Sequence, residues 1–168
     1  MRDSLNWVYR QLFRIGNWIF ELYCYLFKPT RRGVYVAVWW NDRVLLINNS
    51  YRAALTLPSG GIGSQETPLN GAIRELKEEV GITVDTDKVK LLSSFTLKHD
   101  NIQDEVFAFE LVFENQPEIR IDNREVTEAH FEELENALSL NLSAVAAHIL
   151  ELYSQSGRKH LVRQFVEP

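Results

Sequence analysis

Apolar residues recur at helical spacing through the first 28 residues of the chain. They share one side of a helix and are Leu5, Val8, Leu12, Ile15, Ile19, Leu22 and Leu26. Aromatic residues occupy the other sides, so that residues 18–27 are apolar nearly all round apart from Glu21. Pro29 cannot continue a helix. The pattern therefore predicts an amphipathic, aromatic N-terminal helix over residues 1–29, and residues 30–33 link it to the first strand.

Shorter apolar runs predict a set of strands after this helix. The expected strands cover residues 34–40, 43–48, 88–98 and 105–113. The last of them alternates, with Val106 and Ala108 on one face and three phenylalanines on the other, which we assign to the core. A final amphipathic helix is expected over residues 142–152.

A helix with two distinct faces is predicted between Thr67 and Gly81. Thr67 supplies an N-cap hydroxyl, Pro68 fits the first turn, and Gly81 fits the C-terminal cap. The apolar face comprises Leu69, Ala72, Ile73, Leu76 and Val80. The acidic face comprises Glu75, Glu78 and Glu79, because offsets of three and four bring helical side chains together. Like charges at this spacing repel by about 0.2–0.5 kcal/mol per pair, unless a cation lies between them.

The acidic face belongs to a wider constellation of polar residues. Four carboxylates and one arginine follow the loop glycine Gly60, and they are Glu66, Arg74, Glu75, Glu78 and Glu79. Hard cations such as Mg²⁺ bind through a few carboxylates together with substrate phosphates. Arg74 can orient a carboxylate by a charge-assisted hydrogen bond, and Glu66 either reaches the same ions or braces the loop. The full pattern predicts a divalent-cation site that faces a phosphate chain.

Residues 60–82 read GGIGSQETPLNGAIRELKEEVGI and resemble the Nudix box, the signature of the Nudix hydrolases. Every defined position of that signature is filled, and the resemblance extends more loosely from Arg32 to Leu150. Ser59 stands where a glycine is common in the family. The resemblance implies an α/β fold, a Nudix-type α/β/α sandwich with a mixed β-sheet. Residues 30–155 would form this domain, the N-terminal helix an extension, and residues 156–168 a tail.

The resemblance also implies a chemistry, the hydrolysis of a nucleoside diphosphate linked to another group, by water attack on phosphorus. By motif position, Glu75, Glu78 and Glu79 become ligands of Mg²⁺, or of Mn²⁺, and Glu66 is a further candidate ligand. Catalytic roles are expected for Glu75, Glu78, Arg74 and Glu125. The last of these lies in a short stretch that resembles the segment before the family's late helix. The identity of the general base stays open.

Substrate contacts are expected from Tyr51 and Arg52, just after the second strand, and from the loop glycines Gly60 and Gly61. The polar link over residues 98–101 is expected near the mouth of the site, with His99 as a weaker candidate. Two other acidic residues, Asp104 and Glu128, are expected to be surface charges. Nucleoside triphosphates, nucleotide sugars and RNA 5′ ends all remain open as substrates. So do two other functions: a nucleotide-sensing module without turnover, and a hydrolase of lipid or isoprenoid diphosphates at a membrane surface.

Composition narrows the class of protein further. The 168 residues are 45% hydrophobic and 24% charged, as expected for one globular domain. Cys24 is the only cysteine, which excludes a disulfide within the chain and a cysteine-based zinc cluster, and it fits a cytoplasmic protein. Net charge is -5, but residues 1–32 carry +4, so the remainder carries -9. This acidic body argues against binding of duplex nucleic acid.

The N-terminal helix leaves several interpretations open. Its apolar run is too short to span a bilayer, and no small-residue cleavage site of a secretory signal follows it. It therefore packs on the domain, forms a homodimer interface, or lies on a membrane surface as a peripheral contact through residues 1–28.

Overall fold

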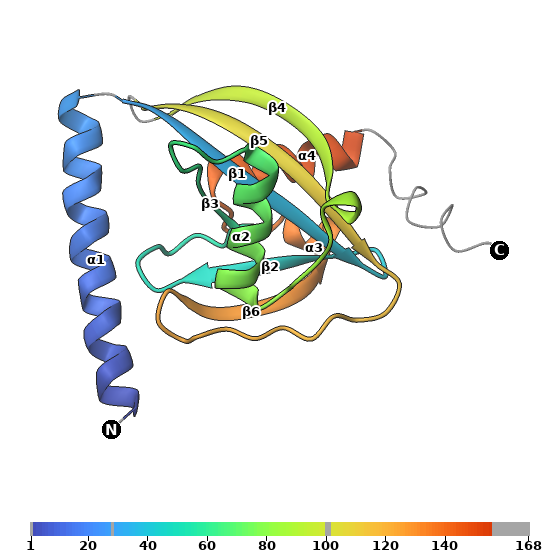
Figure 1. Cartoon of the computed structure of the whole chain (residues 1–168), viewed down its shortest axis with the longest axis horizontal. Coiled ribbons are helices and arrows are strands. Elements are labelled where there is room, and N and C mark those ends of the chain that lie inside the picture. The colour runs from blue at the N-terminus through green and yellow to red at the C-terminus, as the bar shows by residue number, and fades with distance from the viewer. Residues whose placement is uncertain (1, 28, 100–101, 156–168) are drawn as a thin grey trace.

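The computed structural model describes residues 2–27, 29–99 and 102–155 of the chain. A long helix, α1 (Arg2–Phe27), stands beside an α/β domain, as Figure 1 shows. The sheet strands are β1 (Thr30–Trp40), β2 (Arg43–Asn49), β3 (Ser59–Gly61), β4 (Lys90–His99), β5 (Ile102–Phe113) and β6 (Val126–Glu133). The helices of the domain are α2 (Pro68–Val80), the 3-10 turn η1 (Thr86–Lys88), α3 (Leu134–Ala137) and α4 (Ala144–Gln155).

The sheet is mixed, as predicted. Its strand order is β4-β5-β1-β2-β6, and β3 pairs with β1 outside this path. The pairing of β1 with β5 is parallel, whereas the other pairings are antiparallel. The edge of β1 that faces away from β5 pairs with two strands. Residues 33–35 pair with β3, and residues 39 and 40 pair with β2. The acidic helix α2 follows β3 directly, so this shared edge brings the loop and the helix to the middle of the sheet.

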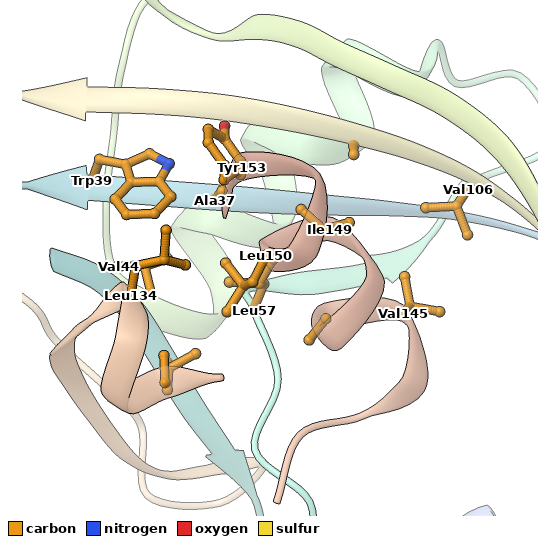
Figure 2. Packing of buried hydrophobic residues seen from close by; sticks show 14 residues of the cluster. Ala37, Trp39, Val44, Leu57, Val106, Leu134, Val145, Ile149, Leu150 and Tyr153 are labelled. Atoms are coloured by element: carbon orange, nitrogen blue, oxygen red, sulfur yellow. The ribbon is translucent and has the colours of Figure 1, made fainter. Parts of the chain in front are cut away.

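Helices cover both faces of the sheet, which confirms the α/β/α sandwich. On one face, α2 packs its predicted apolar stripe against β1 and β2, with Ala72, Leu76 and Val80 fully buried. On the other face, α3 and α4 pack against Trp39, Leu57 and neighbouring apolar residues (Figure 2). Strand β5 supplies both cores, with Val106 and Ala108 on one side and Phe109 on the other. The predicted alternation of this strand is therefore confirmed.

The first strand begins earlier than predicted, and one acidic residue is buried. Residues 30–33 are not a link but the start of β1, because they pair with residues 103–106 of β5. Arg31 lies directly opposite Asp104 and forms an ion pair with it, through two hydrogen bonds. The side chain of Asp104 is buried, so its prediction as a surface charge was wrong. A carboxylate at this depth is stabilised by a paired guanidinium.

Helix α1 contacts the domain along one side. The guanidinium of Arg10 donates to the Asn123 carbonyl at 3.0 and 2.9 Å, and Arg14 donates to the Ser50 carbonyl at 3.1 Å. Cys24 lies on the same side and is fully buried. Within the described residues, no helix is both long enough and apolar enough to cross a bilayer. The helix therefore docks on the domain, and its other sides are exposed.

Three predicted features fall outside the part of the chain that the structure describes. They are the tail over residues 156–168, the middle of the polar link at residues 100–101, and the side chain of His99. Strands β3 and β6 and the short helix α3 were not predicted. In β6 only Val126 is fully buried, and the exposed residues are Glu128, His130 and Glu133, so its apolar alternation is weak.

Candidate active site

The ends of α2 fix where its acidic side chains lie. The Thr67 hydroxyl accepts a hydrogen bond from the Asn70 amide at 3.3 Å, and Pro68 occupies the first helical turn. At the other end Gly81 adopts the left-handed conformation (φ 71°), and its amide donates to the Leu76 carbonyl. Both predicted caps are therefore present, and the acidic side of the helix turns toward β3 and the loop that follows it.

Arg74 holds this loop to the helix. Its guanidinium donates to both carboxylate oxygens of Glu66 at 3.0 Å and to the Gly61 carbonyl at 2.8 Å. It also forms hydrogen bonds with the carboxylates of Glu75 and Glu78. Glu66 accepts a further bond from the Gly63 amide at 3.0 Å. The Arg74 guanidinium, together with that amide, lowers the pKa of Glu66 to about 2.

Two carboxylates of the helix, Glu75 and Glu79, lie on its side toward β3. Glu79 is only 5% exposed, and its Oε2 accepts the Ser59 amide at 2.7 Å. Burial raises the pKa of Glu79 well above its ordinary value, and the nearby carboxylates of Glu75 and Glu125 add to the effect. Burial also raises the pKa of Glu75, against the opposing effect of Arg74. Both carboxylates are therefore harder to ionise here than in water, and a bound cation would favour their charged form.

Gly60 leaves the space that the Glu75 carboxylate fills. A Cβ atom at Gly60 would lie 2.0 Å from Glu75 Oε1 and 2.1 Å from its Cδ. No such contact arises at Gly61, where a Cβ would meet nothing within 4 Å. The two adjacent glycines therefore have different roles. Gly60 permits the close approach of β3 to the acidic helix, and Gly61 offers its carbonyl to Arg74.

Glu125 lies near these carboxylates, although it comes from a distant part of the chain. Its carboxylate accepts the Tyr51 hydroxyl at 3.0 Å, and that hydroxyl also accepts a bond from Asn49 at 3.1 Å. A β-bulge between residues 48 and 49 of β2 precedes this turn, and bulges are common next to active sites. The charge of Glu125 contributes to the raised pKa of both Glu75 and Glu79. The cluster therefore joins carboxylates from α2 and from the segment before β6.

Tyr51 and Arg52, the predicted substrate contacts, lie near these carboxylates. The Arg52 guanidinium stands over the Tyr51 ring, 5.5 Å from its centre. Burial and the charge of Glu125 raise the pKa of Tyr51, so the phenol keeps its proton near neutral pH. A groove of about 450 Å³ extends from Tyr51, Arg52 and Glu125 to α1, which forms its opposite wall.

The donor set fits a hard divalent cation. Its side-chain donors are carboxylate oxygens, and a bound cation would offset the burial that raises the pKa of Glu75 and Glu79. Among the described side chains, no three from His, Cys, Asp and Glu converge closely enough to form a finished metal cluster. Arg74 instead holds Glu66, Glu75 and Glu78, and Glu78 is 59% exposed. Glu128 lies away from this group on the exposed side of β6.

Sequence patterns carried no signal for several members of the site. The Ser59 amide, the bond from Asn49 to Tyr51 and the wall formed by α1 all depend on which distant segments meet. The one available hint for Asn49 is its place at the end of an apolar strand, just before the predicted contacts Tyr51 and Arg52. For α1, the hint was the set of aromatic residues that lie outside its regularly spaced apolar stripe.

Comparisons with known proteins agree with this fold. The family model of the NUDIX domain matches residues 29–153. The uncharacterized Nudix hydrolase YvcI of Bacillus subtilis (strain 168) is 26% identical over 112 residues, which are 66% of this chain and 71% of that protein. The MutT protein from Methanosarcina mazei Go1 superposes with a TM-score of 0.67 at 20% identity, over 79% of this chain and 98% of that one. A bifunctional NMN adenylyltransferase/ADP ribose pyrophosphatase from Francisella tularensis, complexed with AMP and a Mn ion, gives a TM-score of 0.67 at 18% identity, over 85% of this chain and 47% of that one.

Proposed function

Because the chain belongs to the Nudix hydrolase family, we propose that it cleaves a diphosphate linkage in a nucleoside diphosphate derivative, with Mg²⁺ or Mn²⁺ as the required cation. One observation carries this proposal. Glu79 is buried and accepts the Ser59 amide, and Glu75 lies against the Gly60 backbone. The charge of Glu125, which lines an open groove, acts on both carboxylates. A buried carboxylate is costly for a fold when its charge is not compensated, which supports a role for Glu79 in binding a cation.

Each residue of the cluster has a distinct part in the proposed site. Glu75, Glu78 and Glu79 would hold the cation, which when bound neutralises phosphate charge and lowers the pKa of a coordinated water. Arg74 and Glu66 hold the loop, because both oxygens of Glu66 are already engaged by Arg74. We therefore favour bracing over metal binding for Glu66.

The general base would be a carboxylate at the edge of the cluster. Glu79 is buried against the Ser59 amide, and Glu75 lies against Arg74 and the Gly60 backbone. Glu78 is more exposed, and Glu125 borders the groove. We therefore propose Glu78 or Glu125 as the acceptor of the proton from the attacking water. Tyr51 positions Glu125 by its hydroxyl bond.

The solved structure from Francisella tularensis supports the choice of ligand class. That protein is a complex with AMP and a Mn ion, a nucleotide and a divalent cation of the classes proposed here, and this chain covers 47% of it. In this chain, Tyr51 and Arg52 supply an aromatic ring and a cation next to the carboxylates. A nucleotide bound there would place its phosphates toward Arg52 and the cation site.

The test is release of phosphate, pyrophosphate and nucleoside monophosphate from a substrate panel. The panel contains nucleoside triphosphates, nucleotide sugars, ADP-ribose, dinucleoside polyphosphates and isoprenoid diphosphates, each with Mg²⁺, with Mn²⁺ and with EDTA. We expect cation-dependent turnover of a nucleoside diphosphate derivative, lost in Glu78→Gln. Turnover of isoprenoid diphosphates alone would establish the lipid hydrolase instead. Tight nucleotide binding without turnover would establish a sensing module.

A further inference from the structure

The groove beside the cluster has an unusual wall, the N-terminal helix. It is lined from α1 by Tyr9, Leu12, Phe13, Gly16, Asn17 and Phe20, and from the domain by Tyr51, Arg52 and Glu125. We propose that α1 completes the substrate site, and that this groove holds the planar base of a nucleotide. The inference rests on the proposed function, since it assigns the part of the substrate that does not react.

Aromatic side chains lie in the contact between α1 and the domain. The rings of Phe13 and Tyr51 lie nearly parallel, at 27°, with their centres 6.2 Å apart. The Arg124 guanidinium stands 4.5 Å from the centre of the Tyr9 ring, at the other end of the helix contact. Rings and guanidinium planes are the groups on which bases stack. The groove therefore offers faces for a base, and Asn17 offers a polar group for its edge.

Gly16 supports the proposal that α1 forms a wall of the substrate site. A glycine within a helix destabilises it by about 1 kcal/mol relative to alanine. Nothing lies within 4 Å of the position where its Cβ would be, and Gly16 lines the groove. The glycine therefore keeps this stretch of the groove open between Phe13 and Phe20.

The dimensions and position of the groove agree with a nucleotide. Its volume of about 450 Å³ lies within the range of small-ligand sites, about 300–1,000 Å³. Glu125 lines the groove, and its charge acts on Glu79 of the acidic helix. A base in the groove would leave its phosphates beside Arg52, whose charge acts on Glu79.

The test compares two phenylalanines of the same helix. Binding of AMP, GMP, CMP, UMP and ribose 5-phosphate would be measured by calorimetry, with Mg²⁺, for wild type, Phe13→Ala and Phe13→Leu. The matched control is Phe27→Ala, because Phe27 is 69% exposed at the far end of α1. Loss of a stacking ring weakens base binding by about 5- to 100-fold. We expect this loss for nucleotides in both Phe13 variants, and little change for ribose 5-phosphate or in the control.

The outcomes separate this inference from the proposed function. Phe13→Leu keeps an apolar anchor for α1, so a loss in Phe13→Ala alone would indicate docking of the helix and overturn the base site. Equal losses for nucleotides and ribose 5-phosphate would overturn it too, as would failure of all four nucleotides to bind. Wild-type turnover with unchanged nucleotide affinity in Phe13→Ala would leave the function standing without the inference. Nucleotide binding that depends on Phe13, without turnover, would leave the inference standing without the proposed function.

A second apolar stripe of α1, which shares only Leu12 with the lining of the groove, provides an independent observation. Its apolar residues alternate in steps of three and four without a break, and they are Leu5, Val8, Leu12, Ile15, Ile19, Leu22 and Leu26. This is the 3.5-residue period of a coiled-coil seam. These side chains are 45–61% exposed, and the exposed large apolar side chains of the described residues outside α1 are only Leu91, Val112 and Leu140. We infer that the seam pairs with the α1 seam of a second copy of this chain.

Charge favours a second copy over a lipid surface. The positions that flank the seam are uncharged, namely Tyr9, Gln11, Gly16, Trp18, Tyr23 and Tyr25, so two copies meet no like-charge repulsion there. The helix cations Arg10 and Arg14 point to the domain and bond its carbonyls, away from the seam. The remainder of the chain carries -9, which an anionic bilayer would repel.

The test of the seam compares the same substitution, leucine to aspartate, at two exposed leucines. Leu22 lies in the seam and is 45% exposed, whereas Leu91 lies on β4 and is 57% exposed. Light scattering during size-exclusion chromatography should give a dimer of the 19.5 kDa chain for wild type and Leu91→Asp, and a monomer for Leu22→Asp. A wild-type monomer, or a dimer that survives Leu22→Asp, would overturn the inference. Sedimentation of a wild-type monomer with phosphatidylcholine–phosphatidylserine vesicles would assign the seam to membranes.

Discussion

Glu79→Gln is expected to reduce kcat by about 10²- to 10⁴-fold, the loss typical of an essential acid–base or cation-binding group. The amide keeps the shape of the side chain and its bond from the Ser59 amide, but it cannot carry the negative charge that a cation requires. Steady-state turnover of the substrate identified by the panel, at saturating Mg²⁺, measures the effect. Wild-type turnover in this variant would remove Glu79 from the site.

The same variant should be at least as stable as wild type without metal. Burial raises the pKa of Glu79, so ionisation destabilises the folded chain as pH rises from the unfolded-state pKa toward the folded-state value. The amide removes this cost at neutral pH. Thermal unfolding in EDTA measures it. Glu128→Gln is the matched control, because Glu128 is exposed on β6, and it should leave both turnover and stability unchanged.

Gly60→Ala is expected to lower turnover by about 100-fold while the protein stays folded. The new methyl group would lie 2.0 Å from Glu75 Oε1, so the carboxylate must leave its place. The obstructing atoms are the end of a side chain and not backbone, which keeps the cost to folding small. Misplacement of a reacting group by about 1 Å is sufficient for a loss of this size. Turnover and thermal unfolding of the same preparation measure both parts.

Gly61→Ala provides the comparison for this effect. The neighbouring glycine has open space around its Cβ position, and its carbonyl can still accept the bond from Arg74. Turnover should therefore fall far less than in Gly60→Ala. Equal losses at the two positions would contradict a specific contact between Gly60 and Glu75 and would indicate a general need for loop flexibility.

Local sequence determined the acidic helix of this protein. The caps at Thr67 and Gly81 and the 3.6-residue period act within one segment, so the bounds of α2 and its two faces followed from the residues alone. The same holds for α1 and for most strands, whose apolar patterns are strong. Strand β6 did not follow, because its exposed face is charged and its identity as a strand depends on pairing with β2.

Tertiary structure alone decided how the acidic residues differ. Sequence placed Glu78 and Glu79 on one helix face, yet Glu79 is buried under the Ser59 amide and Glu78 is largely exposed. Glu125 joins them because the β2–β6 register sets Asn49 opposite Val126, which brings the Tyr51 hydroxyl to its carboxylate. Long-range pairing also set Asp104 against Arg31 and placed α1 along the groove. Helical periodicity reports which side chains share a face, whereas burial depends on which distant segment covers that face.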